Sequence, residues 1–139
     1  MDGAQVALLD VWNPSLANGI VEAARLVHGT LGPGFLESIY GRAFITELKS
    51  RGFKVEREKT IRIWYASQVV GKHRLDLVIE QSVIAELKAN RGIVSVHTAQ
   101  MNSYLHATGY PAGLILNFGT PELQWEWIPS PKVKQEDFP

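Results

Sequence analysis

The sequence predicts a single α/β domain, a sandwich in which helices flank one central mixed β-sheet. Apolar residues recur with helical spacing between positions 13 and 51, then with the two-residue period of strands over positions 53–88. The order of elements is helix, helix, several strands, helix, strand, strand, which is typical of such a sandwich. The 139 residues, 45% of them hydrophobic, are enough for one domain with a buried core.

Three helices are predicted. Asn13 and Pro14 have the residue types of a helix cap and a first helical position, and the apolar spacing continues to His28. A second helix is predicted over residues 35–51, after a glycine-rich turn. A third is predicted over residues 96–108, where Gly109 ends it.

Alternating or continuous apolar runs predict the strands, and residues 67–72 are predicted to form a turn. The last strand carries Trp125 and Trp127 on one face, to cover the sheet or a subunit interface. The domain is expected to span residues 13–128, between an N-terminal extension (1–12) and a flexible C-terminal tail (129–139). The predicted strands are 53–57, 61–65, 75–79, 83–88, 113–118 and 123–128.

Composition excludes several classes of protein. The 14 basic and 14 acidic residues give zero formal charge, so a polyanion would need a local basic patch or a bound metal. The absence of cysteine excludes disulfides, thiolate zinc sites and cysteine-held iron–sulfur clusters. Without a membrane-spanning apolar run or a secretory signal at the start, a cytoplasmic protein with no membrane partner is expected.

Charged residues interrupt the two apolar runs of a predicted hairpin. Asp76 lies in the first run, and Glu86 and Lys88 lie on one face of the second. If residues 80–82 form a three-residue loop, Asp76 lies opposite Glu86, with Cβ atoms about 5 Å apart. Two carboxylates at that separation repel unless a proton or a cation lies between them. They could instead form the exposed polar face of an edge hairpin, with Lys88 as an ion-pair partner.

Two helices offer further polar groups. Glu37 falls in the first turn of the second helix, where the helix dipole favours an anion. Gln100 and Tyr104 share one face of the third helix. Three acids, a lysine and a glutamine form a sensible site for a hard divalent cation, Mg²⁺ or Mn²⁺. Tyr40 and Tyr104 are interpreted first as core residues with satisfied hydroxyl groups.

Several motifs carry a resemblance to known families. Residues 34–40 match the signature G-x-x-E-x-x-Y of a small prokaryotic family of that name. Asp76, then the E-L-K of residues 86–88, then the Q-x-x-x-Y of residues 100–104 resemble the PD-(D/E)xK nuclease superfamily, and the last part resembles its RecB-type exonucleases. Leu75 stands where the superfamily's name has proline.

This resemblance implies a restriction-endonuclease-like sandwich and a metal-dependent nuclease that hydrolyses phosphodiester bonds of DNA. It implies that Lys88 activates the attacking water, Gln100 positions the lysine or the phosphate, and Tyr104 supports it. His73 is a further candidate for phosphate contact, because it lies between two basic residues before Asp76. The implied ligands of Mg²⁺ or Mn²⁺ are Asp76, Glu86, the carbonyl group of Leu87, and Glu37.

Other functions remain open at this point. The neutral charge and small size fit a catalytically inactive nuclease-fold module for binding or assembly. The same metal site could act on RNA or on nucleotides, because phosphodiester hydrolysis needs the same groups. The sequence also leaves open whether the chain forms a homodimer.

Overall fold

The computed structural model describes residues 13–131, which form three helices and five strands. Asn13 caps the first helix through its side chain, whose Oδ1 accepts a hydrogen bond from the Leu16 amide at 3.1 Å. The elements in chain order are α2 (Pro14–Leu31), α3 (Glu37–Ser50), β1 (Val55–Tyr65), β2 (Gln68–Ile79), β3 (Val83–Lys88), α4 (Ser95–Thr108), β4 (Ala112–Asn117) and β5 (Gln124–Pro129).

The strands form one mixed sheet, as predicted. Their order in space is β1-β2-β3-β4-β5, the same as their order in the chain. Only β3 and β4 run parallel, and the other neighbours are antiparallel. A parallel pair needs a long crossover connection, which α4 provides.

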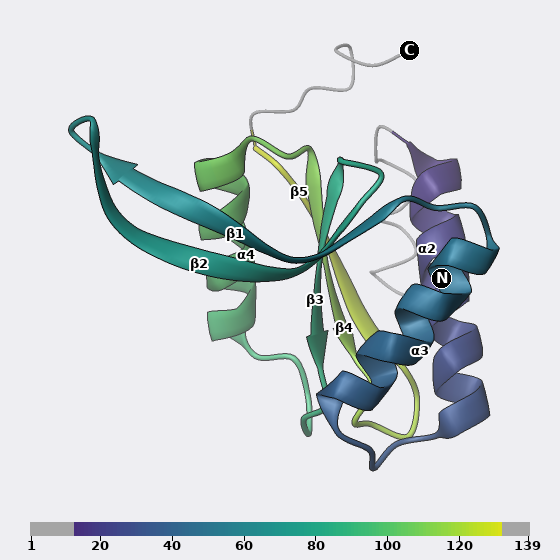
Figure 1. Ribbon diagram of the computed structural model, residues 1–139. Helices are drawn as coiled ribbons and strands as arrows, with labels where there is room; N and C mark the ends of the chain where they lie inside the picture. Colours follow the sequence, from purple (N-terminus) through teal and green to yellow (C-terminus); the bar gives the residue numbers. More distant parts are fainter. Residues whose placement is uncertain (1–12, 132–139) are drawn as a thin grey trace.

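The helices cover the two faces of the sheet (Figure 1). Helices α2 and α3 pack on one face, where the larger core cluster includes Phe44, Leu77 and Phe118. Helix α4 packs on the other, where Ile84, Met101 and Leu105 belong to a second cluster. The sequence-predicted α/β sandwich is therefore confirmed, with the sheet separating two apolar layers.

The structure corrects the prediction for β1 and β2. These strands form one long hairpin, and the turn lies at Ala66 and Ser67, which have φ angles of 49° and 64°. The predicted turn at residues 67–72 is therefore wrong, because Gln68 already begins β2. The predicted break between residues 57 and 61 is also wrong, since β1 is continuous there. Both errors arise where the strands lack a buried face, so that no apolar alternation marks them.

The C-terminal end of the domain extends slightly beyond the predicted boundary. β5 includes Pro129, and Ser130 is buried. The predicted extension (1–12) and most of the predicted tail (132–139) lie outside the described residues. Among residues 13–131, no helix is long and apolar enough to span a membrane.

Candidate functional site

The candidate site lies where β2 separates from β3. The antiparallel ladder between these strands includes Ile79 opposite Val83 and ends with Leu77 opposite Ala85. This register confirms the predicted three-residue loop at residues 80–82. The next residues along the two strands are Asp76 and Glu86, and we call this pair the β2–β3 fork.

Both acids of the fork accept a hydrogen bond from the opposite strand. Oε1 of Glu86 accepts from the Asp76 amide at 3.2 Å, and Oδ2 of Asp76 accepts from the Leu87 amide at 2.9 Å. The two carboxylates thus pair with backbone groups where the backbone ladder has ended, and the amides of Asp76 and Leu87 both find an acceptor there. These reciprocal bonds hold the two acidic side chains next to each other.

The electrostatics of the fork favour a positive species between the acids. Glu86 is only 8% exposed. Burial and, next, the nearby Asp76 carboxylate together raise its pKa from 4.5 to about 8, whereas the hydrogen bond from the Asp76 amide and the charge of Lys88 act in the opposite direction. At neutral pH the fork therefore holds a proton on Glu86 or needs a cation to offset the second negative charge.

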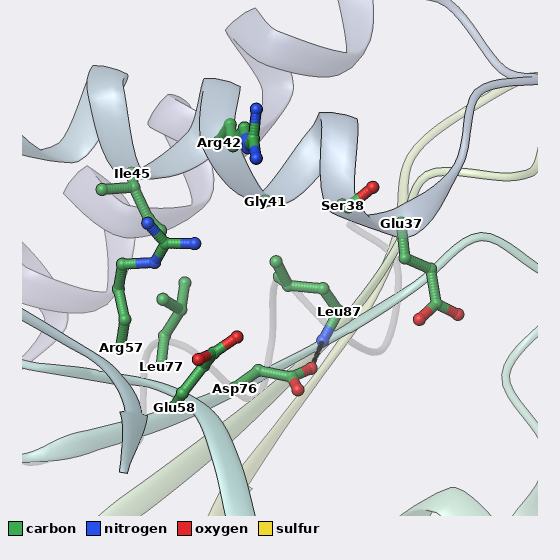
Figure 2. A pocket seen from close by; sticks show the side chains of 10 residues that line it. All are labelled: Glu37, Ser38, Gly41, Arg42, Ile45, Arg57, Glu58, Asp76, Leu77 and Leu87. Carbon is green, nitrogen blue, oxygen red and sulfur yellow. Dashed lines mark hydrogen bonds between the residues drawn. The ribbon is translucent and has the colours of Figure 1, made fainter.

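Asp76 also opens onto a pocket of about 280 Å³ between the sheet and α3, which we call the α3-side pocket (Figure 2). Glu37 from α3 and Leu87 from β3 contribute to its wall, whereas Glu86 and Lys88 do not. The full lining is Glu37, Ser38, Gly41, Arg42, Ile45, Arg57, Glu58, Asp76, Leu77 and Leu87. The structure therefore brings Glu37 and Asp76 to one pocket and Asp76 and Glu86 to one fork.

The position of Glu37 depends on the turn before α3. Glu37 is the first residue of the helix and is exposed. The hydroxyl group of the buried Tyr40 donates to the carbonyl of Gly32 and accepts from the amide of Phe35 at 3.1 Å. The ring of Tyr40 stacks on Phe118 with 4.8 Å between centroids. Tyr40 thus has the predicted structural role, and it fixes the turn that leads into Glu37.

Lys88 lies close to the fork without an ion pair. It is half-buried at the end of β3, opposite Asn117 of β4. Within residues 13–131, the only ion pairs are Arg51–Glu47 and Lys59–Glu56, so Lys88 does not bridge to Glu86. Its ammonium group is therefore free of an intramolecular carboxylate partner in the described part of the chain.

The other predicted residues lie on the opposite face of the sheet. His73, Gln100 and Tyr104 line a cavity of about 850 Å³ between α4 and the β1–β2 hairpin, which we call the arm–α4 cavity. The ring of His73 meets that of Tyr104 edge-on at 5.2 Å. Burial raises the pKa of Tyr104, and the charges of Glu86 and Asp76 raise it further. Tyr104 therefore lies near the fork although it faces the α4 side.

The prediction of a single pocket shared by the acids and the lysine is thus corrected. Helices α3 and α4 cover opposite faces, so Glu37 and Gln100 are separated by the sheet. Among residues 13–131, no three Asp, Glu or His side chains gather closely enough to hold a metal ion by themselves. The two fork carboxylates form the compact acidic pair that remains.

Neither Glu58 nor Arg57 is among the candidate site residues named from the sequence. Both line the α3-side pocket with Asp76, as Figure 2 shows. Glu58 has a φ of 50°, which is uncommon for a residue other than glycine. This twist of β1 lets two consecutive residues reach one pocket. The available signal was the run of five polar residues at 56–60, of which residues 58–60 were interpreted as a gap between two strands.

Comparisons with known proteins give a family match and a similar solved structure. The family model described as the PD-(D/E)XK nuclease superfamily matches residues 14–128. A search of curated proteins finds no significant match. The crystal structure of SSO0001 aligns with a TM-score of 0.54 and 19% sequence identity, over 73% of this chain and 53% of that one. The chain thus spans about half the length of SSO0001, and at this identity the likeness concerns the fold alone.

Proposed function

Because the chain belongs to the PD-(D/E)XK nuclease superfamily, we propose that it is a nuclease that hydrolyses phosphodiester bonds of DNA with a divalent metal ion. The observation that carries this proposal is the pair of carboxylates at the β2–β3 fork. Asp76 and Glu86 are held side by side by backbone hydrogen bonds, although two negative charges at this place repel each other.

The donor set at the fork fits Mg²⁺ or Mn²⁺. Magnesium is commonly held by one or two carboxylates, with water and substrate phosphate as its other ligands, so a third acidic residue is not required. A bound cation would also replace the proton that the raised pKa of Glu86 otherwise retains. We propose Asp76, Glu86 and the carbonyl of Leu87 as direct ligands, with Glu37 reaching the metal through water from across the α3-side pocket.

The protein's own groups have distinct roles in this proposal. The amide of Leu87 holds the Asp76 carboxylate in place, and the amide of Asp76 does the same for Glu86. Lys88, free of an ion pair with Glu86, would orient the attacking water and offset negative charge in the transition state. When bound, the metal supplies Lewis acidity toward the phosphate and lowers the pKa of the water. His73, Gln100 and Tyr104 would contact the substrate from the α4 side.

The test is a cleavage assay with labelled single-stranded DNA, duplex DNA and RNA in Mg²⁺ or Mn²⁺. We expect DNA products from the wild type. Asp76→Asn, Glu86→Gln and Lys88→Met should each lower the cleavage rate by about 100-fold or more. The exposed Glu122→Gln is the matched control and should cleave like the wild type. Calorimetric titration with Mn²⁺ should show binding that Asp76→Asn abolishes.

A wild type that cleaves none of these substrates in either metal would contradict the proposal. Preferential cleavage of RNA would support the proposed metal site but would contradict the proposed DNA substrate.

One observation favours a second candidate, an inactive nuclease-fold module for binding or assembly. Both fork carboxylates already accept backbone hydrogen bonds, and the described chain gathers no third ligand beside them. The two acids would then serve only to hold β2 and β3 together beyond the end of the backbone ladder. This candidate predicts that calorimetric titration with Mn²⁺ shows no heat of binding and that the wild type cleaves none of the substrates. It also predicts that Asp76→Asn lowers the melting temperature of the protein.

A further inference from the structure

The β1–β2 hairpin continues well beyond the rest of the sheet. β2 pairs with β3 only as far as Leu77, and from there toward its N-terminal end it pairs with β1 alone. Figure 1 shows the two strands projecting past the other three as an arm. We call residues 60–74 the distal arm.

The distal arm carries a local positive charge in a chain with no net charge. It contains Arg62, Lys72 and Arg74, together with His73, and it contains no Asp or Glu. All four side chains are exposed. Within residues 13–131, none of the three permanent cations has an ion-pair partner. Arg62 lies directly opposite Lys72 in the strand register, an arrangement that destabilises a hairpin unless an anion lies nearby.

Large aromatic side chains lie among these cations. Trp64 is 60% exposed and Tyr65 is 75% exposed, at the end of the hairpin. Exposed aromatic rings beside basic residues are the usual means of binding single-stranded nucleic acid, because unpaired bases stack on the rings while phosphates contact the cations.

The arm is connected to the candidate site through the arm–α4 cavity. Arg62, Trp64 and His73 line this cavity together with Gln100 and Tyr104. Tyr104 in turn lies within the electrostatic influence of Glu86 and Asp76. Along β2, Lys72 is four residues from Asp76, a distance of about 13 Å in an extended strand. A bound strand could therefore extend from the arm to the fork.

We propose that the distal arm binds single-stranded nucleic acid, with bases stacked on Trp64 and Tyr65 and phosphates contacting Arg62, Lys72 and Arg74. The inference rests on the proposed function only in one respect, that the bound nucleic-acid strand runs toward the fork. Binding at the arm does not itself require cleavage. A duplex would not present its base faces to the two rings. A second copy of the arm would bring like charges together.

The experiment measures fluorescence anisotropy of a labelled single-stranded DNA of about 16 nucleotides, in EDTA so that nothing is cleaved. Trp64→Ala should weaken binding by about 5- to 100-fold, and Trp64→Phe should retain most of it. Arg62→Gln/Lys72→Gln should weaken it about tenfold or more and should lower the salt slope by about 1.4. Arg25→Gln/Lys49→Gln removes two exposed charges from α2 and α3 and is the matched control, expected to bind like the wild type.

Three outcomes would overturn the inference. One is binding that the arm variants leave unchanged or that the control pair weakens equally. Another is tighter binding of duplex that does not depend on Trp64. The third is a wild-type dimer in sedimentation that Trp64→Ala converts to a monomer, which would make the arm a subunit interface. Unfolding curves of each variant verify that it is folded.

The inference and the proposed function fail separately. If the wild type cleaves DNA while Trp64→Ala binds normally, the arm has no role in binding and the nuclease proposal remains. If the wild type binds through the arm in EDTA but cleaves nothing in Mg²⁺ or Mn²⁺, the nuclease proposal fails and the arm remains a binding surface.

Discussion

The two halves of β2 have different environments although they belong to one continuous strand. The half from Leu75 to Ile79 is almost entirely buried, and β3 flanks part of it on the side opposite β1. The half from Gln68 to Arg74 pairs with β1 alone, and every residue in it is exposed. The buried half stabilises the domain and ends at the acidic fork. The exposed half contributes little to the core, so its residues are free to serve binding.

This contrast shows that backbone pairing between strands and burial of apolar side chains contribute separately to the stability of the domain. Backbone hydrogen bonds continue along the whole β1–β2 hairpin, whereas apolar burial stops near the fork. Hydrophobic burial contributes most of the stabilisation of a domain, so mutations in the two halves should differ strongly in cost. The predictions below test that difference, beginning with the largest effect.

Leu77→Ala should lower the free energy of unfolding by about 2–5 kcal/mol, because it leaves a cavity in the core. Leu77 is 2% exposed and packs in the cluster beneath α2 and α3. Urea unfolding followed by circular dichroism measures the change. A loss below about 1 kcal/mol would mean that the buried half of β2 is less tightly packed than the structure indicates.

Glu86→Gln should change how stability depends on pH in EDTA. The pKa of Glu86 in the folded protein is about 8, above its ordinary value of 4.5. Its contribution to stability is therefore complete below about pH 4.5 and is lost as the pH rises through 8, by at most about 1.4 kcal/mol per pH unit. The glutamine variant lacks this titration and should be more stable than the wild type at pH 8.5.

Urea unfolding at pH 5 and pH 8.5 measures this effect, with the exposed Glu122→Gln as the matched control. Equal pH slopes in the wild type and Glu86→Gln would contradict the prediction. Addition of Mn²⁺ should restore the stability that the wild type loses at pH 8.5 and should not stabilise Glu86→Gln, because a bound cation replaces the proton on Glu86.

Val70→Ala should have the smallest effect, within about 0.5 kcal/mol on the free energy of unfolding. Val70 is 61% exposed and has no partner in the register, which shifts at this point of the hairpin. The same urea measurement applies. A cost comparable to that of Leu77→Ala would show that the distal arm is covered in solution, for example by a second copy.

The acidic fork could be predicted from residue order because a hairpin register follows from counting. Once residues 80–82 form a three-residue loop, Ile79 must face Val83, and Asp76 and Glu86 are then the residues that follow the last pair, Leu77 and Ala85. Val83 to Lys88 was also predicted with both its ends, because a short apolar run between turn residues is a strong local signal.

The grouping of the helical residues could not be predicted in the same way. Glu37 and Gln100 belong to helices whose placement on the sheet depends on packing of the whole core, and the structure puts them on opposite faces. Glu58 was missed because its backbone twist at φ 50° depends on the geometry of the hairpin around it. Periodicity carries no information about such a twist.

The order of helices and strands, the single mixed sheet and the neighbouring positions of Asp76 and Glu86 could be predicted from the sequence alone, since they follow from local periodicity and from the length of one loop. Packing of the whole domain decided which helix covers which face, and hence that Glu37 and Gln100 are separated. It also decided that the distal arm extends past the other strands. The physical reason is that these features depend on contacts between segments far apart in the chain, which no local pattern encodes.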